Sequence, residues 1–566
     1  MIMSASGCLQ PSAPGAANGR CEPLADVDLR PGFVTFAKLR SFRNKPKLVN
    51  AIGFHHRNLA AGHVFLICFE NQSSVFKKKQ FDHFDGDVKA MKEATIAFAA
   101  ILAGTTWFAS QTIAQNDALT SELSTQEKMV HRRAVETAVW AMPLTNAIAM
   151  RDGFAEVGCN YNVVCYFSKI QDYRAAVTTP NDTTPYVMAF WNIADGPVMI
   201  EVPPTEGDLG LWGTLMDIWQ RPLADVGAKG RDKGAGASYL IVPEGYDGET
   251  FGADYVLPQT TLNGYTLLRP IIPDASPSSL AAAEEFTKKL KIFDPEQPAQ
   301  TQYLDVQGMD IDGVVEFDRS LFVLIDEFVQ SENLEERDAV ALGMLRRLGI
   351  EKGREFTPTE RELEILDHAA NEAKVFLQEA YFDNHSEKQE MGNGWTVLTP
   401  ATSYETTFSW LLDSGAIALD DRGSSFFAFY TSAEEFNLTA PPTMYLLTSR
   451  DADDERLDGG TTYSLVVPPD VPVSQFWSVL VYDFEDATFL DGLEKYGVAS
   501  TEELEVNEDG SVRVVFGPEL PDGVSQSNYV PTATGGGWFP YFRFYGPGEA
   551  LFSGDYQLPK IEKLIE

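Results

Sequence analysis

The apolar positions between about residues 160 and 270 form short runs rather than helical stripes. Runs such as YVMAFWNI (186–193) and SYLIVP (238–243) are rich in β-branched and aromatic residues, and Gly, Pro and Asp separate them. Strands at this spacing are typical of two stacked sheets. We therefore predict an N-terminal domain over residues 115–275 that is an immunoglobulin-like β-sandwich.

A second β pattern runs over residues 393–566. It contains SSFFAFYTS (424–432), TTYSLVVP (461–468) and QFWSVLVYD (475–483), with turns such as EDGS between the runs. About eight strands in one continuous set are typical of a jelly roll. The body is thus predicted to be mainly β and multidomain, with a C-terminal jelly-roll domain.

Helical periodicity separates the two β regions and predicts a helical connector over residues 276–392. Its clearest helix lies within residues 356–382, where Thr357 is the expected cap, Pro358 fits the first turn and Glu360 completes a capping box. The predicted buried face of this helix consists of Leu363, Leu366, Ala370, Ala373 and Leu377. Residues 126–150 predict another helix, which we expect to kink or end at Pro143.

The stretch MKEATIAFAAILAGTTWFASQTIAQ (91–115) has the pattern of a secretory leader. An apolar run of about 16 residues is short for a membrane span, which needs about 20, and a small-x-small cleavage site ends at Ala114. We expect a signal peptide from Met91 to Ala114, with an uncleaved anchor and a core helix as the alternatives. The protein would then be exported, periplasmic or extracellular, with no stable membrane span after the leader is removed.

Composition changes at the same place. The whole chain carries a formal charge of −38, but residues 1–114 hold 13 Lys and Arg against 8 Asp and Glu, and the remainder holds 31 against 74. Three of the five cysteines and four of the seven histidines precede Met91. We interpret residues 1–90 as a non-native, disordered upstream extension. A body this acidic repels phosphate backbones, which argues against a nucleic-acid partner.

Few of the remaining residues form a recognised catalytic pattern. The sequence does not contain G-x-S-x-G, a motif of serine hydrolases, or H-E-x-x-H, a motif of zinc proteases. His131 is expected to face solvent. Glu364, His368 and Glu372 form a ladder that would suit a metal ion, but the ladder lacks a second histidine and is interpreted as a solvated helix face. No metal site is assigned, and the cofactor is left unknown.

Polar and aromatic residues in the β regions are the candidate ligand-binding residues. In TTPNDTTPY (178–186), the Asn-Asp pair favours a turn, and paired carboxylates would do acid–base work if they converge. The aromatic set in the second β region is interpreted as buried core or, alternatively, as a cleft for a sugar. The candidates are Asn181, Asp182, Tyr186, Asp217, Trp219, Arg221, Trp477, Tyr482, Asp483 and Arg543. Cys159 and Cys165 are a candidate disulfide pair, with pairing left open.

Several of these motifs together resemble a known pair of domains. TTPNDTTPY, LMDIWQRPLADVG (215–227) and GRDKGAGASYLIVPEGY (230–246) resemble domain of unknown function 1254, and NYVPTATGGGWFPYFRFYGP (528–547) resembles domain of unknown function 1214. The resemblance implies a sandwich, a small helical unit and a jelly roll in an exported or envelope-associated protein, and it implies no reaction.

The sequence therefore predicts an exported envelope or periplasmic protein that binds a carbohydrate or another small polar molecule. A hydrolase or lyase that uses carboxylates with Arg or Tyr is one alternative. A structural assembly protein is another, and a homo-oligomer is compatible with all three.

Overall fold

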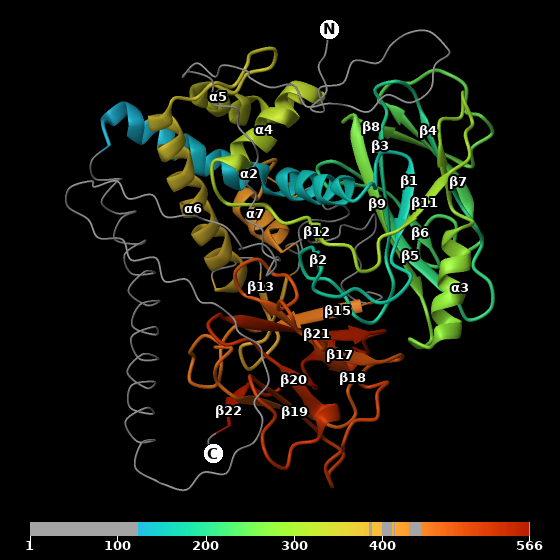
Figure 1. Ribbon diagram of the computed structural model, residues 1–566, viewed down its shortest axis with the longest axis vertical. Helices are drawn as coiled ribbons and strands as arrows, with labels where there is room; N and C mark the ends of the chain where they lie inside the picture. Colours follow the sequence, from blue (N-terminus) through green and yellow to red (C-terminus); the bar gives the residue numbers. More distant parts are fainter. Residues whose placement is uncertain (1–122, 384–387, 399–409, 413, 429–442, 565–566) are drawn as a thin grey trace, which may run out of the picture. The chain divides into compact units, whose positions relative to one another are not determined.

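The computed structural model describes residues 123–564 apart from 384–387, 399–409, 413 and 429–442. The expected upstream extension (1–90) and leader (91–114) lie outside the described residues. The described chain is mainly β, with several sheets and a few helices (Figure 1).

The first β region consists of a six-stranded and a four-stranded sheet that share one hydrophobic core. The first sheet has the order β11 (Gln302–Asp305), β1 (Val163–Tyr166), β3 (Val187–Asn192), β9 (Asn263–Ile271), β5 (Gly210–Asp217) and β6 (Pro222–Gly227). The second has the order β10 (Lys291–Phe293), β4 (Val198–Val202), β7 (Ala237–Pro243) and β8 (Tyr255–Gln259). Helix α3 (Pro277–Thr287) adds Phe286 to the shared core.

Strands from beyond residue 275 complete both sheets. β10 pairs with β4, and β11 runs parallel to β1, so each covers an edge that would otherwise expose unpaired backbone groups. A short parallel pair, β2 (Ala175–Ala176) with β12 (Ile311–Asp312), extends the same connection. The first β region therefore takes in part of the segment predicted as helical connector.

The second β region has the same general plan. Its larger sheet has the order β13 (Lys388–Glu390), β14 (Thr396–Leu398), β15 (Thr443–Leu447), β21 (Trp538–Tyr545), β17 (Trp477–Asp483) and β18 (Gly497–Ala499). Its smaller sheet has the order β20 (Tyr529–Pro531), β19 (Val512–Gly517), β16 (Tyr463–Val467) and β22 (Glu562–Lys563). Apolar side chains from both sheets form one core.

Helix α2 (Thr125–Glu156) is the centre of a helical layer (Figure 1). The helices packed against it are α4 (Ser320–Ser331), α5 (Ala339–Leu348), α6 (Glu360–Phe382) and α7 (Leu419–Phe427). Their largest core cluster also includes side chains from β3, β17 and β21, so the helices and both β regions share apolar contacts. None of the described helices is long and apolar enough to cross a lipid bilayer.

The sequence predicts that helix 126–150 kinks or ends at Pro143. The helix does not end there, because α2 continues to Glu156. Proline removes one helical hydrogen bond, here the one to the carbonyl of Val139. Tertiary contacts compensate: Gly423 of α7 lies so close that an added Cβ would come within 2.9 Å of that carbonyl oxygen, and Gln220 donates a 2.7 Å hydrogen bond to the carbonyl of Pro143.

Two further local predictions need correction. Helix α6 is capped by Thr359, which forms a reciprocal capping box with Glu362, and not by Thr357. The strand predicted over residues 424–432 is wrong in its first half, since residues up to Phe427 belong to α7, and residues 429–432 lie outside the described residues. A short apolar run does not by itself distinguish a strand from a buried helix. The predicted buried face of α6 is confirmed at all five positions.

Candidate functional site

The candidate site lies where the outer face of the larger C-terminal sheet meets the first β region. On β17, Val479 and Val481 face the core of the second β region, whereas Leu480 and Tyr482 join the cluster that contains the helices. Side chains of a strand alternate between the two faces of its sheet, so the tyrosines and the arginine of one sheet face are directed toward the TTPNDTTPY motif.

The motif forms a turn that contacts this sheet face through polar groups. Asn181 accepts hydrogen bonds from the backbone and hydroxyl of Thr183 at 2.9 and 2.6 Å, as the predicted turn requires, and its amide nitrogen lies 3.3 Å from the hydroxyl of Tyr545. The hydroxyl of Tyr482 donates a 2.7 Å hydrogen bond to the carbonyl of Pro180. The motif is therefore a contact between the two regions as well as a turn.

Arg543 on β21 lies at the centre of the site. Arg543 is 2% exposed. The central carbon of its guanidinium group lies 5.0, 5.6 and 5.8 Å from the ring centres of Tyr445, Tyr482 and Tyr541. Among the described residues, Nη2 makes only long contacts of 3.5 Å, to two main-chain carbonyls of the motif. Nε and Nη1 have no hydrogen-bond acceptor within the described residues.

A second arginine, Arg269 on β9, shares the contact with Tyr445. It lies 5.7 Å from the ring centre of Tyr186, and its Nη1 donates a 3.3 Å hydrogen bond to the hydroxyl of Tyr445. Its Nε is buried and has no acceptor in the described part of the chain. Although burial acts in the opposite direction, Arg269 and Arg543 together lower the pKa of Tyr445.

The carboxyl group of Asp182 is influenced by the charge of Arg543. Burial raises the pKa of Asp182 to about 7, with Arg543 opposing the shift and Glu502 adding to it. Arg269, Tyr445 and Asp182 are partly exposed, whereas Arg543 is buried.

The arrangement suits an anion. A buried guanidinium costs several kcal/mol unless acceptors replace its lost water, and cation–π contacts offset only about 0.5–2 kcal/mol of this. Carboxylate and phosphate oxygens match the geometry of guanidinium donors, and their negative charge strengthens each hydrogen bond.

Three other predicted residues form a separate polar group. Arg221 binds Asp217 at 2.6 Å and Glu335 at 2.7 Å, and Asp217 is 2% exposed. Trp219 packs edge-on against Trp140, with ring centres 5.1 Å apart. No contact in the described residues joins Asp217 to Asp182, so these two carboxylates do not form the acid–base pair considered from the sequence.

Trp477 and Asp483 also lie apart from the arginine cluster. Trp477 points into the core of the second β region and stacks on Phe542 at 5.2 Å. Asp483 accepts a 2.7 Å hydrogen bond from the backbone of Glu485 in the turn after β17. The core interpretation of Trp477 is the one the packing supports.

Arg269 was missed by the sequence analysis. It lies in the strand segment YTLLRPII, where it is the one charged residue in an otherwise apolar run. A lone charge at such a position was the available signal, because a buried strand rarely contains an arginine without a partner.

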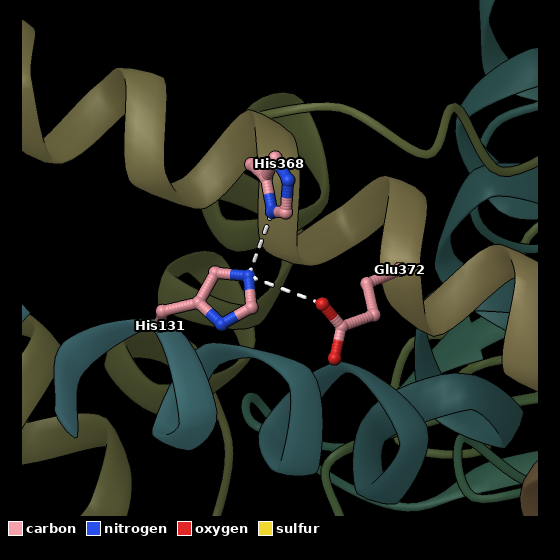
Figure 2. A group of neighbouring side chains, drawn as sticks. All are labelled: His131, His368 and Glu372. Carbon is pink, nitrogen blue, oxygen red and sulfur yellow. Dashed lines mark hydrogen bonds and ion pairs between the residues drawn. The ribbon is translucent and has the colours of Figure 1, made fainter. Parts of the chain in front are cut away.

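The prediction that His131 faces solvent is wrong, and so is the solvated-face interpretation of His368. The two residues are 3% and 7% exposed, and Nε2 of His131 lies 2.8 Å from Nδ1 of His368 (Figure 2). Burial lowers the pKa of His131, with Glu372 opposing the shift. A second histidine, His131 of α2, therefore does lie beside His368 and Glu372 of α6.

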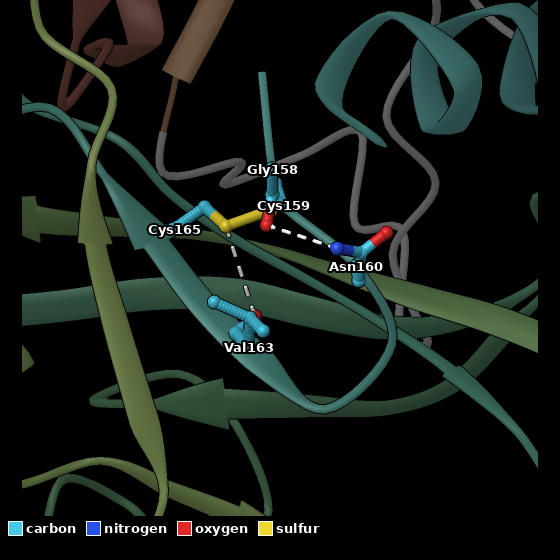
Figure 3. Close-up of a disulfide and its surroundings, with 5 residues drawn as sticks. All are labelled: Gly158, Cys159, Asn160, Val163 and Cys165. Atoms are coloured by element: carbon cyan, nitrogen blue, oxygen red, sulfur yellow. Dashed lines mark hydrogen bonds between the residues drawn. A yellow bond between two sulfur atoms is a disulfide. The ribbon is translucent and has the colours of Figure 1, made fainter. Parts of the chain in front are cut away.

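Cys159 and Cys165 form a disulfide that closes the loop between α2 and β1, with their Cα atoms 6.0 Å apart (Figure 3). Both residues are buried. The pairing that the sequence left open is therefore present in the structure.

Two family models match the chain. Protein of unknown function DUF1254 matches residues 161–293, and protein of unknown function DUF1214 matches residues 442–549. The resemblance found from the motifs is thus confirmed for both domains. Arg269 belongs to the first matched segment, and Arg543 belongs to the second.

Two solved structures are similar to the chain at low identity. The VPA0106 protein from Vibrio parahaemolyticus is 17% identical with a TM-score of 0.46, and the match covers 77% of this chain and all of that one. An uncharacterised protein from Burkholderia cenocepacia is 13% identical with a TM-score of 0.32, covering 81% of this chain and 97% of that one. No curated protein matches the chain.

Proposed function

We propose that this chain, which carries the domains of unknown function 1254 and 1214, binds a small anionic molecule between Arg269 and Arg543. The observation that carries the proposal is the buried guanidinium of Arg543, whose Nε and Nη1 have no acceptor in the described residues. A carboxylate or phosphate group would supply the missing acceptors and neutralise the buried charge.

The surrounding side chains favour an organic anion over an inorganic one. Tyr445, Tyr482 and Tyr541 place their rings next to Arg543, and the hydroxyl of Tyr445 also contacts Arg269. Aromatic walls with a few convergent polar groups are the usual lining of a small-molecule site. A sugar acid combines the polar ligand expected from the sequence with the negative charge that the arginines require.

Ligand binding is tested by the thermal stability of the full chain in sodium D-glucuronate, sodium phosphate and D-glucose at constant ionic strength. We expect glucuronate to raise the melting temperature most, phosphate less, and glucose not at all. Titration calorimetry should show at least about tenfold weaker glucuronate binding in Arg543→Gln, because hydrogen bonds to charged groups contribute about 1.5–3 kcal/mol.

Arg269→Gln is the second variant, since Arg269 is partly exposed and its replacement is less disruptive to folding. The matched control is Arg513→Gln, which changes an exposed arginine on β19 in the other sheet. An equal response to glucose and glucuronate, or unchanged binding in both Arg543→Gln and Arg269→Gln, would overturn the proposal.

A lyase or hydrolase that acts on the same anion is the second candidate. Two pKa shifts favour this candidate. Burial alone would raise the pKa of Tyr445, but the two arginines lower it, and the pKa of Asp182 is about 7. A carboxyl group that titrates near neutral pH, such as that of Asp182, serves general acid–base catalysis. Tyr445→Phe should then abolish turnover of a bound sugar acid while leaving its dissociation constant within about threefold, as for loss of a single weak contact.

Export is likewise a proposal, as is cleavage of the leader after Ala114. The Cys159–Cys165 disulfide supports it, because disulfides persist mainly in oxidising compartments. N-terminal sequencing of the protein from its native cells should give Gln115 as the first residue. A mature chain that begins before Met91 would contradict both export by this leader and our interpretation of residues 1–90.

The immunoglobulin-like and jelly-roll assignments also stay proposals. The pairing of a larger with a smaller sheet around one core in each β region supports them. A strand-by-strand comparison of connection order with those two folds is the test. Homo-oligomer formation is proposed on the exposed apolar residues Val340, Val375 and Phe376 of α5 and α6, and light scattering of the full chain would test it.

A further inference from the structure

Two helices bring three potential metal ligands to one point, away from the arginine cluster. His131 comes from the beginning of α2, and His368 and Glu372 come from consecutive turns of α6 (Figure 2). Residues four apart on a helix lie on the same face, so both α6 side chains can reach the same point beside α2.

The geometry points to a Zn²⁺ site formed by His131, His368 and Glu372, and we propose this site as a new one. Nε2 of His131 lies 2.8 Å from Nδ1 of His368 and 3.4 Å from Oε2 of Glu372, and all three ligand atoms lie within 4.8 Å of one another. A tetrahedral zinc ion with bonds of about 2.0–2.1 Å separates its ligand atoms by roughly 3.3 Å. Small side-chain movements would therefore complete the coordination.

A hydrogen bond alone accounts for only part of this arrangement. If His131 donates this hydrogen bond, the single proton on its Nε2 has to serve both the imidazole nitrogen of His368 and the carboxylate of Glu372, and if His368 donates it, a lone pair on Nε2 of neutral His131 faces the carboxylate. Three atoms with lone pairs converge, and a cation satisfies all three at once. Two imidazoles with one carboxylate favour zinc over magnesium or calcium, which prefer oxygen ligands.

The burial of the three residues indicates what kind of site this is. The two histidines are buried, but the Glu372 side chain is 52% exposed, so the fourth coordination position would face solvent and take water. Glu372 supplies the one negative charge, and the nearby positive charge of Arg132 acts against the cation. We therefore expect moderate zinc affinity rather than the very tight binding of a four-cysteine site.

The site would fasten the first turns of α2 to α6. These helix starts are already linked by an ion pair of 2.8 Å between Arg361 and Glu127, the residue that also completes the cap of α2. A bound ion would add a second and stronger link one to two turns further along.

The test uses the full chain after dialysis against a chelator. Zinc titration by calorimetry should give one ion per chain, and Co²⁺ should give the visible absorption bands of tetrahedral coordination. Glu372→Gln keeps the shape of the side chain and removes the charged ligand. It should weaken zinc binding at least about tenfold, because tenfold is the smallest loss typically caused by replacing even a residue that hydrogen-bonds to a metal ligand.

The matched control is Glu364→Gln, which changes an exposed glutamate of the same helix that pairs with Arg361 and lies outside the three ligands. His368→Gln is a second variant and should abolish the Co²⁺ bands, with circular dichroism used to confirm that it folds. Absence of zinc binding by the wild type, or equal zinc affinity in Glu372→Gln and Glu364→Gln, would overturn the proposal. Because no ligand of this site belongs to the arginine cluster, either result is independent of anion binding.

Discussion

Tyr482 on β17 donates a 2.7 Å hydrogen bond to the main-chain carbonyl of Pro180, which precedes it by 302 residues. The bond is buried, and it joins the most distinctive turn of the first β region to the central strands of the second. It also holds the turn against Arg543, whose longer contacts reach the same carbonyl.

Tyr482→Phe should therefore destabilise the protein by about 1–3 kcal/mol, because the carbonyl of Pro180 loses its strongest donor while it stays buried. Urea unfolding of the full chain measures this change. Tyr246→Phe is the control, since Tyr246 also donates to a carbonyl, at 2.9 Å, but within its own exposed turn. Equal effects of the two substitutions would mean that the bond between the regions has no special role.

Arg221→Gln should be among the most destabilising single changes in the first β region. It leaves Asp217, 2% exposed, without its 2.6 Å ion pair, and breaking a buried pair from one side costs about 3–5 kcal/mol. Lys289→Gln is the comparison, because its 3.1 Å pair with Glu285 lies between exposed side chains. Thermal melting should show a large decrease for the first variant and no measurable change for the second.

Asp182 should make stability fall as pH rises. Burial raises its pKa from 3.8 to about 7 in the folded protein, so the folded state keeps a proton that the unfolded state releases between these values. The contribution is complete below about pH 4 and is lost as pH rises through 7. Since one pKa unit corresponds to about 1.4 kcal/mol, the loss is at most about 4 kcal/mol, and partial exposure reduces it.

Asp182→Asn removes this dependence, so the melting temperature of the variant should decrease less than that of the wild type between pH 5 and 8. Asp195→Asn, in an exposed turn, is the control and should follow the wild type. A variant that loses stability over this range as steeply as the wild type would show that Asp182 is ionised throughout.

Local pattern was enough to predict most of the strands named from the sequence, although it also placed one where α7 ends. Once a strand is recognised, alternation separates Val479 from Tyr482 along β17, because side chains of a strand point to opposite faces whatever the rest of the fold does. Pro143 shows the limit of such local rules. The helix passes through it because Gln220 and α7 supply contacts that no window around residue 143 contains.

The candidate site shows the same limit. Asn181 and Arg543 were each identified from the sequence, but nothing local places them together, since the contact depends on how two β regions pack. The same cause hid the partner of His368, which lies 237 residues away on α2. Residues were thus predictable one at a time, whereas the groups that they form were not.

The disulfide gives a prediction that depends on one short loop. Cys159 and Cys165 are separated by six positions, and the chain-entropy relation gives a stabilisation of roughly 2 kcal/mol for closing a loop of that size. Reduction by dithiothreitol should therefore lower the melting temperature of the wild type. The double variant Cys159→Ser with Cys165→Ser should melt at the reduced temperature and should not respond to dithiothreitol. No other cysteine lies in residues 115–566, so a response of the double variant to dithiothreitol would have to come from cysteines upstream of Met91. In protein purified from the native cells, such a response would contradict our interpretation that the natural protein lacks residues 1–90.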